Sequence, residues 1–464
     1  MSTTGDYGPV TQDVEQADDR SDRAPDIDPA GTARGERRYR FLVAGCSLSS
    51  YGTFLNMVAL NLFVYETTGR ALAMGLFMAV RLGSGFVAGL AAGVLLARFT
   101  ARSVMLWTNA AQAAVMLSLI LAPEGMRTAA LMAVSVVVGA CGTLFMVSLR
   151  SSIPEMVGDD RRSWANSLSI TGRSLAMVAG FASAGVVVSL VGYTVAFVVD
   201  MATFVVCAVT VALLPIAGGG GGKGARPESE RDSGGRPRDR KKGAWARRWR
   251  LPGAFLGSAA APGLGLMVVL RGVDAFGSSS HNAALPVHSA GLDASRPAVF
   301  VSAFWCLWAL GNVVAQQLIQ RYAARTGRSV GAPGFGYGTC LMSGAFILAF
   351  AGFPYAATAV IALVAGAADG LTEVSYTSHL QTLPADLRGH AFGFSATVEN
   401  LGFGVGMILV AAALDNHSPL TVVAWSHGAA IVVAVLFLIR VTGPRSGGRV
   451  PAPRSGADRD GQMR

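Results

Sequence analysis

This 464-residue chain has few charged residues for its length. Asp, Glu, Lys and Arg make up only 14% of it, whereas an average soluble protein carries roughly 25%. More than half of these charges lie in three segments, residues 1–40, 217–250 and 440–464. The apolar stretches between those segments therefore have too little charge to cover the surface of a soluble domain. This distribution excludes a soluble enzyme and a disordered or collagen-like chain.

Cysteine is also scarce. The 5 cysteines are odd in number, far apart, and each lies in an apolar run, so they indicate neither a disulfide framework nor a zinc site. The glycine run 218–222 is followed by Lys223, but Gly224 stands where a phosphate loop needs Ser or Thr. No nucleophile–base pair is recognisable. We expect no metal, no cofactor and no enzymatic activity.

Acidic and basic residues are concentrated in different segments of the chain. The net charge is +10, yet residues 1–40 are acidic, with 9 acids against 6 bases. The excess of bases lies in 217–250, with 11 Lys and Arg against 4 acids, and in 440–464, with 6 against 2. Basic segments that border apolar spans are typical of cytoplasmic loops under the positive-inside rule. The lipid bilayer is therefore the expected partner, and nucleic acid is not.

Long apolar stretches fill the rest of the chain. About 20 apolar residues are needed to cross the hydrocarbon core of a bilayer as a helix, and twelve stretches meet that need. They are 41–65, 71–96, 104–122, 128–149, 166–190, 193–214, 264–287, 297–318, 334–353, 355–378, 391–413 and 420–440. The sequence predicts an all-α integral membrane protein with twelve transmembrane helices in two pseudo-symmetric six-helix bundles.

The predicted domains follow from these spans. The bundles occupy 41–216 and 251–440, and a basic Gly-rich linker joins them over 217–250. Residues 1–40, which lack the apolar region of a signal peptide, and residues 441–464 are expected to be disordered tails. The only basic residues in the predicted outer loops are Arg70, Arg127 and Arg296. We therefore expect a multi-pass protein of the plasma membrane with both termini in the cytoplasm.

The two halves resemble each other in sequence. Gly52, Ala59 and Leu60 recur at an offset of 225 as Gly277, Ala284 and Leu285. The segment 98–103 after the second span, with Arg98 and Arg102, recurs at an offset of 223 after the eighth, with Arg321 and Arg325. A duplicated six-helix unit places a cavity between the halves, near the middle of the bilayer.

Twelve spans, a long basic central loop and a short basic loop after the second span resemble the major facilitator superfamily. Its loop signature is Gly, an Asp, then Arg-x-Gly-x-Arg-Arg. Gly93, Arg98 and Arg102 match it, whereas Ala97 and Thr100 replace the Asp and the second Gly. The resemblance implies that these residues, with Arg321 and Arg325, form a gating loop.

Two further segments narrow the resemblance. The runs 153–166, beginning Ile-Pro-Glu-Met-Val, and 383–389, Leu-Pro-Ala-Asp-Leu-Arg-Gly, are similar to the enterobactin-exporter and macrolide-efflux branch. This branch implies a monomeric secondary transporter that exports a drug, siderophore or secondary metabolite by alternating access. An importer or facilitator of the same fold and a non-transporting sensor or scaffold remain alternatives.

Ionisable side chains within the spans carry the functional expectations, since each costs roughly 2.5–3.5 kcal/mol to insert into the membrane. Asp274, Ser278 and His281 share one face of the seventh span. The equivalent positions of the first span are Ser49, Thr53 and Asn56. We predict that both faces line the shared substrate cavity. The alternative is that Arg271 simply neutralises Asp274, three residues away.

The tenth span carries the expected proton site. Asp369 and Glu373 share a face that Tyr376 continues, and two carboxylates this close in a low dielectric cannot both ionise without cost. A carboxyl group that exchanges a proton near neutral pH is what proton coupling requires. The alternative is a structural ion pair with Arg388 or another arginine of the cytoplasmic side.

Three more spans contribute candidates. Arg173 and Glu399 lie at equivalent places on the fifth and eleventh spans and could pair across the cavity in one state of the transport cycle. Arg81 could meet an anionic group of the substrate, and Asp200 has no partner that the sequence identifies. Inward proton flow through Asp274, Asp369, Glu373 or Glu399 is thus predicted to drive export of an amphipathic small molecule.

Overall fold

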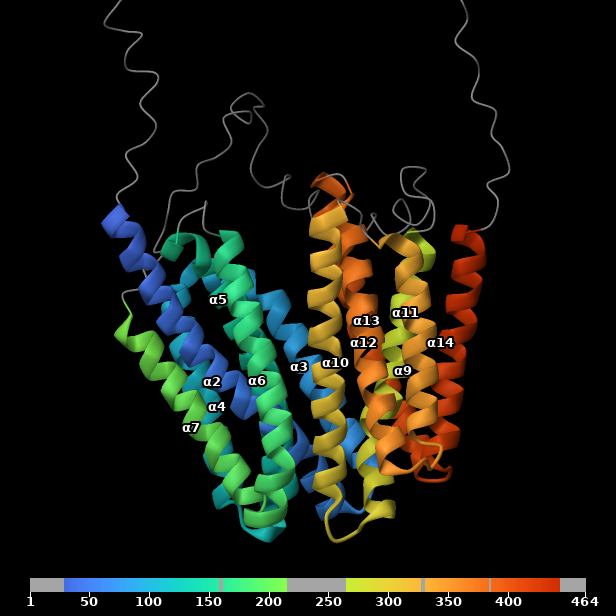
Figure 1. Cartoon of the computed structure of the whole chain (residues 1–464). Coiled ribbons are helices and arrows are strands. Elements are labelled where there is room, and N and C mark those ends of the chain that lie inside the picture. The colour runs from blue at the N-terminus through green and yellow to red at the C-terminus, as the bar shows by residue number, and fades with distance from the viewer. Residues whose placement is uncertain (1–28, 158–161, 215–263, 327–329, 384, 443–464) are drawn as a thin grey trace, which may run out of the picture.

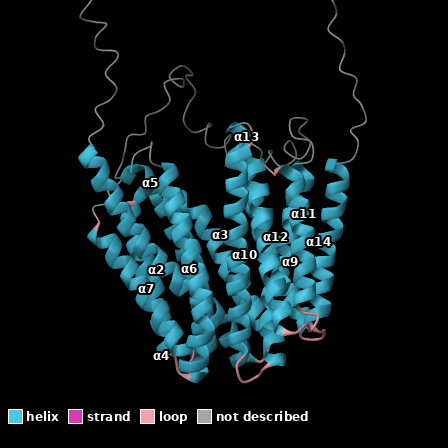
Figure 2. Cartoon of the chain, in the orientation of Figure 1, coloured by secondary structure: helices cyan, strands magenta, loops and turns pink. Residues whose placement is uncertain are grey.

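A computed structural model describes residues 29–157, 162–214, 264–326, 330–383 and 385–442. Within these ranges the chain forms helices and loops and no strand (Figure 2). The elements are α2 (Pro29–Thr68), α3 (Ala71–Arg98), α4 (Ala101–Leu121), η1 (Glu124–Met126), α5 (Arg127–Val157), α6 (Arg162–Val191), α7 (Tyr193–Leu213), α9 (Leu264–Leu292), α10 (Pro297–Thr326), α11 (Gly331–Ala349), α12 (Tyr355–Gln381), α13 (Ala385–Leu414) and α14 (Pro419–Thr442).

The long helices form two groups side by side, α2–α7 and α9–α14 (Figure 1). This confirms the predicted architecture of two six-helix halves. Ten of the described helices are long and apolar enough to cross a membrane by length and composition; α9 and α11 fall outside that group. Charged and polar side chains such as Arg271 and Asp274 lower the hydropathy of α9, and glycines lower that of α11.

Several helices extend beyond the predicted spans. The first begins at Pro29, so residues 29–40 are helical, whereas the sequence led us to expect a disordered tail up to residue 40. The helix ending at Val157 likewise continues past the predicted end at 149. Hydropathy marks only the lipid-facing part of a helix, while backbone hydrogen bonds continue into the polar interface. The predicted linker 217–250 and residues 443–464 of the second tail lie outside the described residues.

The outer faces of the helices are apolar. Leu90, Leu190 and Ile439 are 71%, 79% and 63% exposed, and Trp107 is 76% exposed. A soluble monomer rarely exposes so many large apolar side chains. This surface is that of a multi-pass membrane protein.

The two halves meet at one end only. One apolar cluster near the loops opposite the start of α2 combines Leu55 and Phe181 of the first half with Trp305 and Met407 of the second. At the end where α2 begins and α14 ends, which we call the terminal end, each half has a cluster of its own. Tyr39 and Met105 belong to one, and Phe335 and Leu380 to the other. The halves are thus sealed together at the opposite end and separate at the terminal end.

Two helix pairs make the seal. At Gly75 of α3, an added Cβ atom would collide with Met407 and Ala411 of α13. At Gly185 of α6 it would lie 3.0 Å from the Ala298 carbonyl oxygen of α10. The Phe181 and Trp305 rings of the same pair are stacked with centroids 5.8 Å apart. Small residues let these backbones approach where lipid provides no hydrophobic drive.

Candidate functional site

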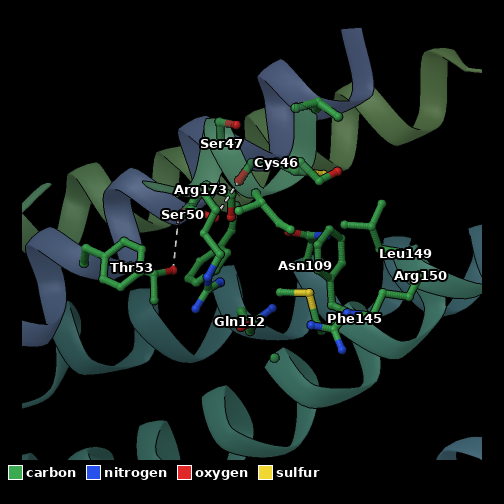
Figure 3. Close-up of a pocket in the computed structure, with 18 of the residues that line it drawn as sticks. Cys46, Ser47, Ser50, Thr53, Asn109, Gln112, Phe145, Leu149, Arg150 and Arg173 are labelled. Atoms are coloured by element: carbon green, nitrogen blue, oxygen red, sulfur yellow. Dashed lines mark hydrogen bonds between the residues drawn. The ribbon is translucent and has the colours of Figure 1, made fainter. Parts of the chain in front are cut away.

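A cavity of about 490 Å³ lies within the first half (Figure 3). It extends from Val43 and Ile153, towards the terminal end, to Thr53 and Phe204, midway along their helices. All of its lining residues come from α2 to α7. The repeat had predicted a cavity walled by both halves. This cavity lies inside the first half, whereas a smaller one of about 280 Å³ lies between α3 of the first half and α13 of the second.

Four of the predicted cavity residues line this space: Ser49, Thr53, Arg81 and Arg173. The Thr53 hydroxyl donates to the Ser49 carbonyl oxygen at 3.0 Å within α2. The Arg173 guanidinium lies 5.2 Å over the Phe54 ring, a cation–π distance. The first span therefore does present a polar face to a cavity.

Sequence reasoning missed several other polar residues of this wall, among them Asn109 and Gln112 of α4 and Arg150 of α5. The two amides are 2% and 4% exposed and donate to the carbonyl oxygens of Met105 and Thr108. Arg150 had been assigned to a loop because the predicted span ended at 149. Its spacing of four residues places it on the same helix face as Met146, but only the structure shows that this face lines the cavity.

Asn56 does not line the cavity. Its Nδ2 donates to the Asp200 Oδ2 of α7 at 2.6 Å, and both residues are buried. Arg81 lies near enough to interact electrostatically with the Asp200 carboxylate. The buried acid that had no partner in the sequence thus has two in the structure.

In the second half, one arginine joins three acids. The Arg271 Nη2 of α9 lies 2.8 Å from Glu373 Oε2 of α12 and 2.9 Å from Glu399 Oε1 of α13. Its Nη1 lies 3.8 Å from Asp274 Oδ2. The Arg271 and Asp274 side chains are 11% and 5% exposed, whereas those of Glu373 and Glu399 are 49% and 41% exposed. We call these four residues the Arg271 cluster.

The Arg271 cluster bears on both alternatives raised by the sequence. Arg271 does pair with Asp274, but its shorter contacts are with Glu373 and Glu399. Glu373 does pair with an arginine, but that arginine lies within a span. The side chain of Arg388, the other candidate, lies outside the described residues.

The other predicted residues of α12 have separate partners. Asp369 accepts a hydrogen bond from Asn312 Nδ2 of α10 at 2.9 Å rather than facing Glu373. Tyr376 is buried, and its hydroxyl donates to Ser395 Oγ at 2.5 Å. Its ring centroid lies 5.2 Å from the Arg271 guanidinium. Tyr376 therefore supports the Arg271 cluster from within the second half and does not line the described cavity.

The three residues of α9 that were predicted to line a cavity lie in different surroundings. Asp274 joins the Arg271 cluster, and Ser278 is partly exposed. His281 is buried, with Nδ1 3.1 Å from His427 Nε2 and its ring 3.5 Å from that of Phe346. In this conformation it packs inside the second half rather than on a cavity.

The predicted pair between Arg173 and Glu399 is absent from this conformation, since Arg173 lies over Phe54 and Glu399 binds Arg271. Gly93 lies within α3, and a Cβ atom added there would have no neighbouring atom within 4 Å. Arg102 Nη2 donates to the Ala212 carbonyl oxygen near the end of α7 at 2.5 Å. The predicted gating loop is mostly helical, because Arg98 ends α3, Arg102 lies in the first turn of α4, and Arg321 and Arg325 lie on α10. Arg98, Arg321 and Arg325 are exposed.

Residues 42–407 match the family described as Major Facilitator Superfamily. The chain belongs to the major facilitator superfamily. This confirms the family expected from the loop and span pattern. No curated protein matches the sequence. Among the described residues of this superfamily member, no group of three or more His, Cys, Asp or Glu is placed to hold a metal ion.

Solved transporters share the fold. A peptide transporter POT in complex with sulfate is 13% identical with a TM-score of 0.63, over 87% of this chain and 94% of that one. A mutant of the nucleoside transporter NupG is 13% identical with a TM-score of 0.63, over 88% and 99%. A POT family transporter in complex with 5-aminolevulinic acid is 10% identical with a TM-score of 0.64, over 86% and 95%. At these identities the likeness shows the fold alone, which is consistent with secondary transport.

Proposed function

We propose that this superfamily member is a proton-coupled secondary transporter of the plasma membrane that exports an amphipathic small molecule. It works by alternating access with both termini in the cytoplasm, as a monomer. The export direction rests on the resemblance of segments 153–166 and 383–389 to the enterobactin-exporter and macrolide-efflux branch. The open terminal end would then face the cytoplasm, where an exporter collects its substrate.

The observation that carries the proposal is the Arg271 cluster. Its single guanidinium is shared among Glu373, Glu399 and Asp274, which come from three different helices. Charged groups inside the bilayer are costly and are usually kept where a pathway or relay needs them. The Glu373 and Glu399 side chains are half-exposed, whereas that of Asp274 is buried.

Protonation of Glu373 or Glu399 would weaken the ion pair between that residue and Arg271. The guanidinium would then interact mainly with the acids that remain ionised. Because these acids lie on α12 and α13, such an exchange changes which helices α9 is tied to. Asp369, bonded to Asn312, provides a second acid on α12 that could accept the proton. Proton binding is thereby linked to helix rearrangement.

The proposal is tested in inside-out membrane vesicles with two dyes that share a xanthene ring, the anionic carboxyfluorescein and the cationic rhodamine 6G. Wild-type protein should accumulate at least one dye when the lumen is acidified, and the gradient collapser nigericin should abolish it. Asp274→Asn, Asp369→Asn, Glu373→Gln and Glu399→Gln are measured beside it. Glu124→Gln is the matched control, since the Glu124 side chain is 90% exposed on η1.

We expect at least one of the four variants, and not the control, to keep dye binding while losing its dependence on the pH gradient. Unchanged gradient dependence in all four would refute the coupling assignment. Dye movement only in the opposite direction would indicate an importer. Binding without movement under any gradient would instead indicate a sensor or scaffold.

A further inference from the structure

Positive charge in the cavity is contributed by three arginines, Arg81 of α3, Arg150 of α5 and Arg173 of α6. None of the residues that line it is Asp or Glu. Three acids of the second half lie instead around Arg271, on α9, α12 and α13. The interior of the protein is thus divided into a cationic compartment in one half and an acidic one in the other.

These three guanidinium groups are not neutralised by close ion pairs. Among the described residues, no carboxylate lies within 4.0 Å of any of them. Asp200 offsets Arg81 in part, from behind the cavity wall. Arg150 and Arg173 are exposed to the cavity, and their guanidinium groups point into the same space (Figure 3). Cations that line a concave site with low-dielectric walls raise the local concentration of anions.

The remainder of the wall is suited to a ligand that has both apolar and hydrogen-bonding parts. Phe54, Phe145 and Leu149 provide apolar surface, and Asn109 and Gln112 provide amides. A volume of about 490 Å³ falls within the range of roughly 300–1,000 Å³ found for sites that enclose drug-sized ligands.

We propose that the cavity binds an amphipathic organic anion, with one or two carboxylate, sulfonate or phosphate groups held by Arg150 and Arg173 and an apolar body against Phe54 and Phe145. The inference rests on the proposed transport function and specifies its substrate class. A guanidinium forms charge-assisted, frequently bidentate hydrogen bonds with such groups. Two separate arginines favour a ligand with two acceptor groups over one with a single charge.

Cys46 makes the charge of the cavity measurable, because it lines the same wall. A variant that keeps only this thiol is made by replacing Cys141, Cys207, Cys306 and Cys340 with Ala. It is treated in detergent with an anionic reagent, sulfonatoethyl methanethiosulfonate, and a cationic one, trimethylammonioethyl methanethiosulfonate. Each rate is divided by the rate of the same reagent with free glutathione, so that intrinsic reactivity cancels.

We expect Cys46 to favour the anionic reagent by about tenfold or more at low salt. Arg150→Gln with Arg173→Gln should bring the ratio close to one, and Arg150→Lys with Arg173→Lys should retain it. Arg127→Gln, at the opposite end of the first half, is the control and should change nothing. Equal rates of the two reagents in the parent protein, or a preference for the cationic reagent, would overturn the proposal.

Protection of Cys46 by the two dyes completes the test. Carboxyfluorescein should slow labelling in a saturable way, and rhodamine 6G should not; the double Gln variant should lose this protection. Protection by rhodamine 6G alone would overturn the substrate class while leaving proton-coupled transport intact. Conversely, carboxyfluorescein protection without gradient-driven movement would support the anion site and refute the transport proposal.

Discussion

Arg271 is the residue on which the electrostatics of the second half depend. Among the residues that the structure describes, it alone is paired with two acids of other helices and with one of its own. Its Nε has no hydrogen-bond partner among the described residues, so both Nη atoms provide the contacts. A cation with fewer partners would be costly at this depth, and so would the acids without the cation. The group is stable only as a unit.

Replacing Arg271 with Gln should therefore destabilise the protein. Removing one partner of a fully buried ion pair costs roughly 3–5 kcal/mol, and the cost here should be smaller because water screens the half-exposed Glu373 and Glu399. The measurement is the midpoint of thermal unfolding in detergent. At pH 7 the variant's midpoint should lie clearly below that of the wild type, and this difference should narrow at a pH low enough to protonate the acids.

Two comparisons make this test specific. Arg271→Lys should retain part of the stability, because an ammonium keeps the charge but loses the fork geometry. Arg440→Gln removes a charge at the exposed end of α14 and should leave the midpoint unchanged. If Arg271→Gln unfolds at the wild-type temperature, the Arg271 cluster contributes nothing to stability.

At the residue scale, sequence spacing predicted which side chains share a helix face but not what they meet. Asp369 and Glu373 were predicted as a pair, yet Asp369 bonds Asn312 and Glu373 bonds Arg271. These partners lie 57 and 102 residues away in the chain. Only the packing of α10 against α12 and the reach of the Arg271 side chain from α9 bring them close, and no periodicity of α12 contains that information.

At the scale of elements, close helix contacts depend on single glycines. Gly366 of α12 lies against α10, and a Cβ atom added there would overlap the backbone of Trp308. Gly344 of α11 has open space where its Cβ would be. The two positions are therefore a matched pair, since both are helical glycines within a span and only one is at a contact.

Gly366→Ala should lower the unfolding midpoint in detergent, because α10 and α12 must move apart to accept the methyl group. Gly344→Ala should leave the midpoint unchanged or raise it, because alanine favours the helix by about 1 kcal/mol over glycine. Equal effects at the two sites would show that α10 and α12 do not pack as closely as the structure indicates.

The existence of each predicted span followed from hydropathy, but helix ends did not. All twelve predicted stretches correspond to helices. The misplaced boundary at residue 149 had a consequence, because it removed Arg150 from the cavity wall. An arginine at the polar end of a span looks like a loop residue to a hydropathy scale, although its backbone continues the helix to Val157.

At the scale of the whole molecule, the repeated halves have different interiors. Duplication predicts matched polar faces on α2 and α9, and the former does line a cavity through Ser49 and Thr53. On the latter, His281 is instead buried with His427 and Phe346. The equivalent of His281 on α2 is Asn56, which is also buried, against Asp200. The repeat thus predicts the packing of the halves, whereas their separate side chains determine the chemistry of each.

The seal between the halves makes the conformation itself testable. Gly75 allows α3 to contact α13 at the sealed end, where any side chain would meet Ala411 and Met407. Gly75→Leu should wedge this end apart and shift the population towards the conformation that is closed at the terminal end. Cys46, which lies in the cavity on the open side, should then become less accessible.

The readout is labelling of the Cys46-only protein by the anionic thiol reagent, which should slow severalfold in Gly75→Leu. Gly344→Leu is the control, because Gly344 lies on α11, which among the described helices contacts only those of the second half, with no atom within 4 Å of its Cβ position. Both variants must elute as a single folded species for the comparison to hold. An unchanged labelling rate in folded Gly75→Leu would mean that the α3–α13 contact does not set which end is open. Slower labelling would show that the contact between α3 and α13 at the sealed end controls access to Cys46. This would hold although the cavity itself is lined only by α2 to α7 of the first half.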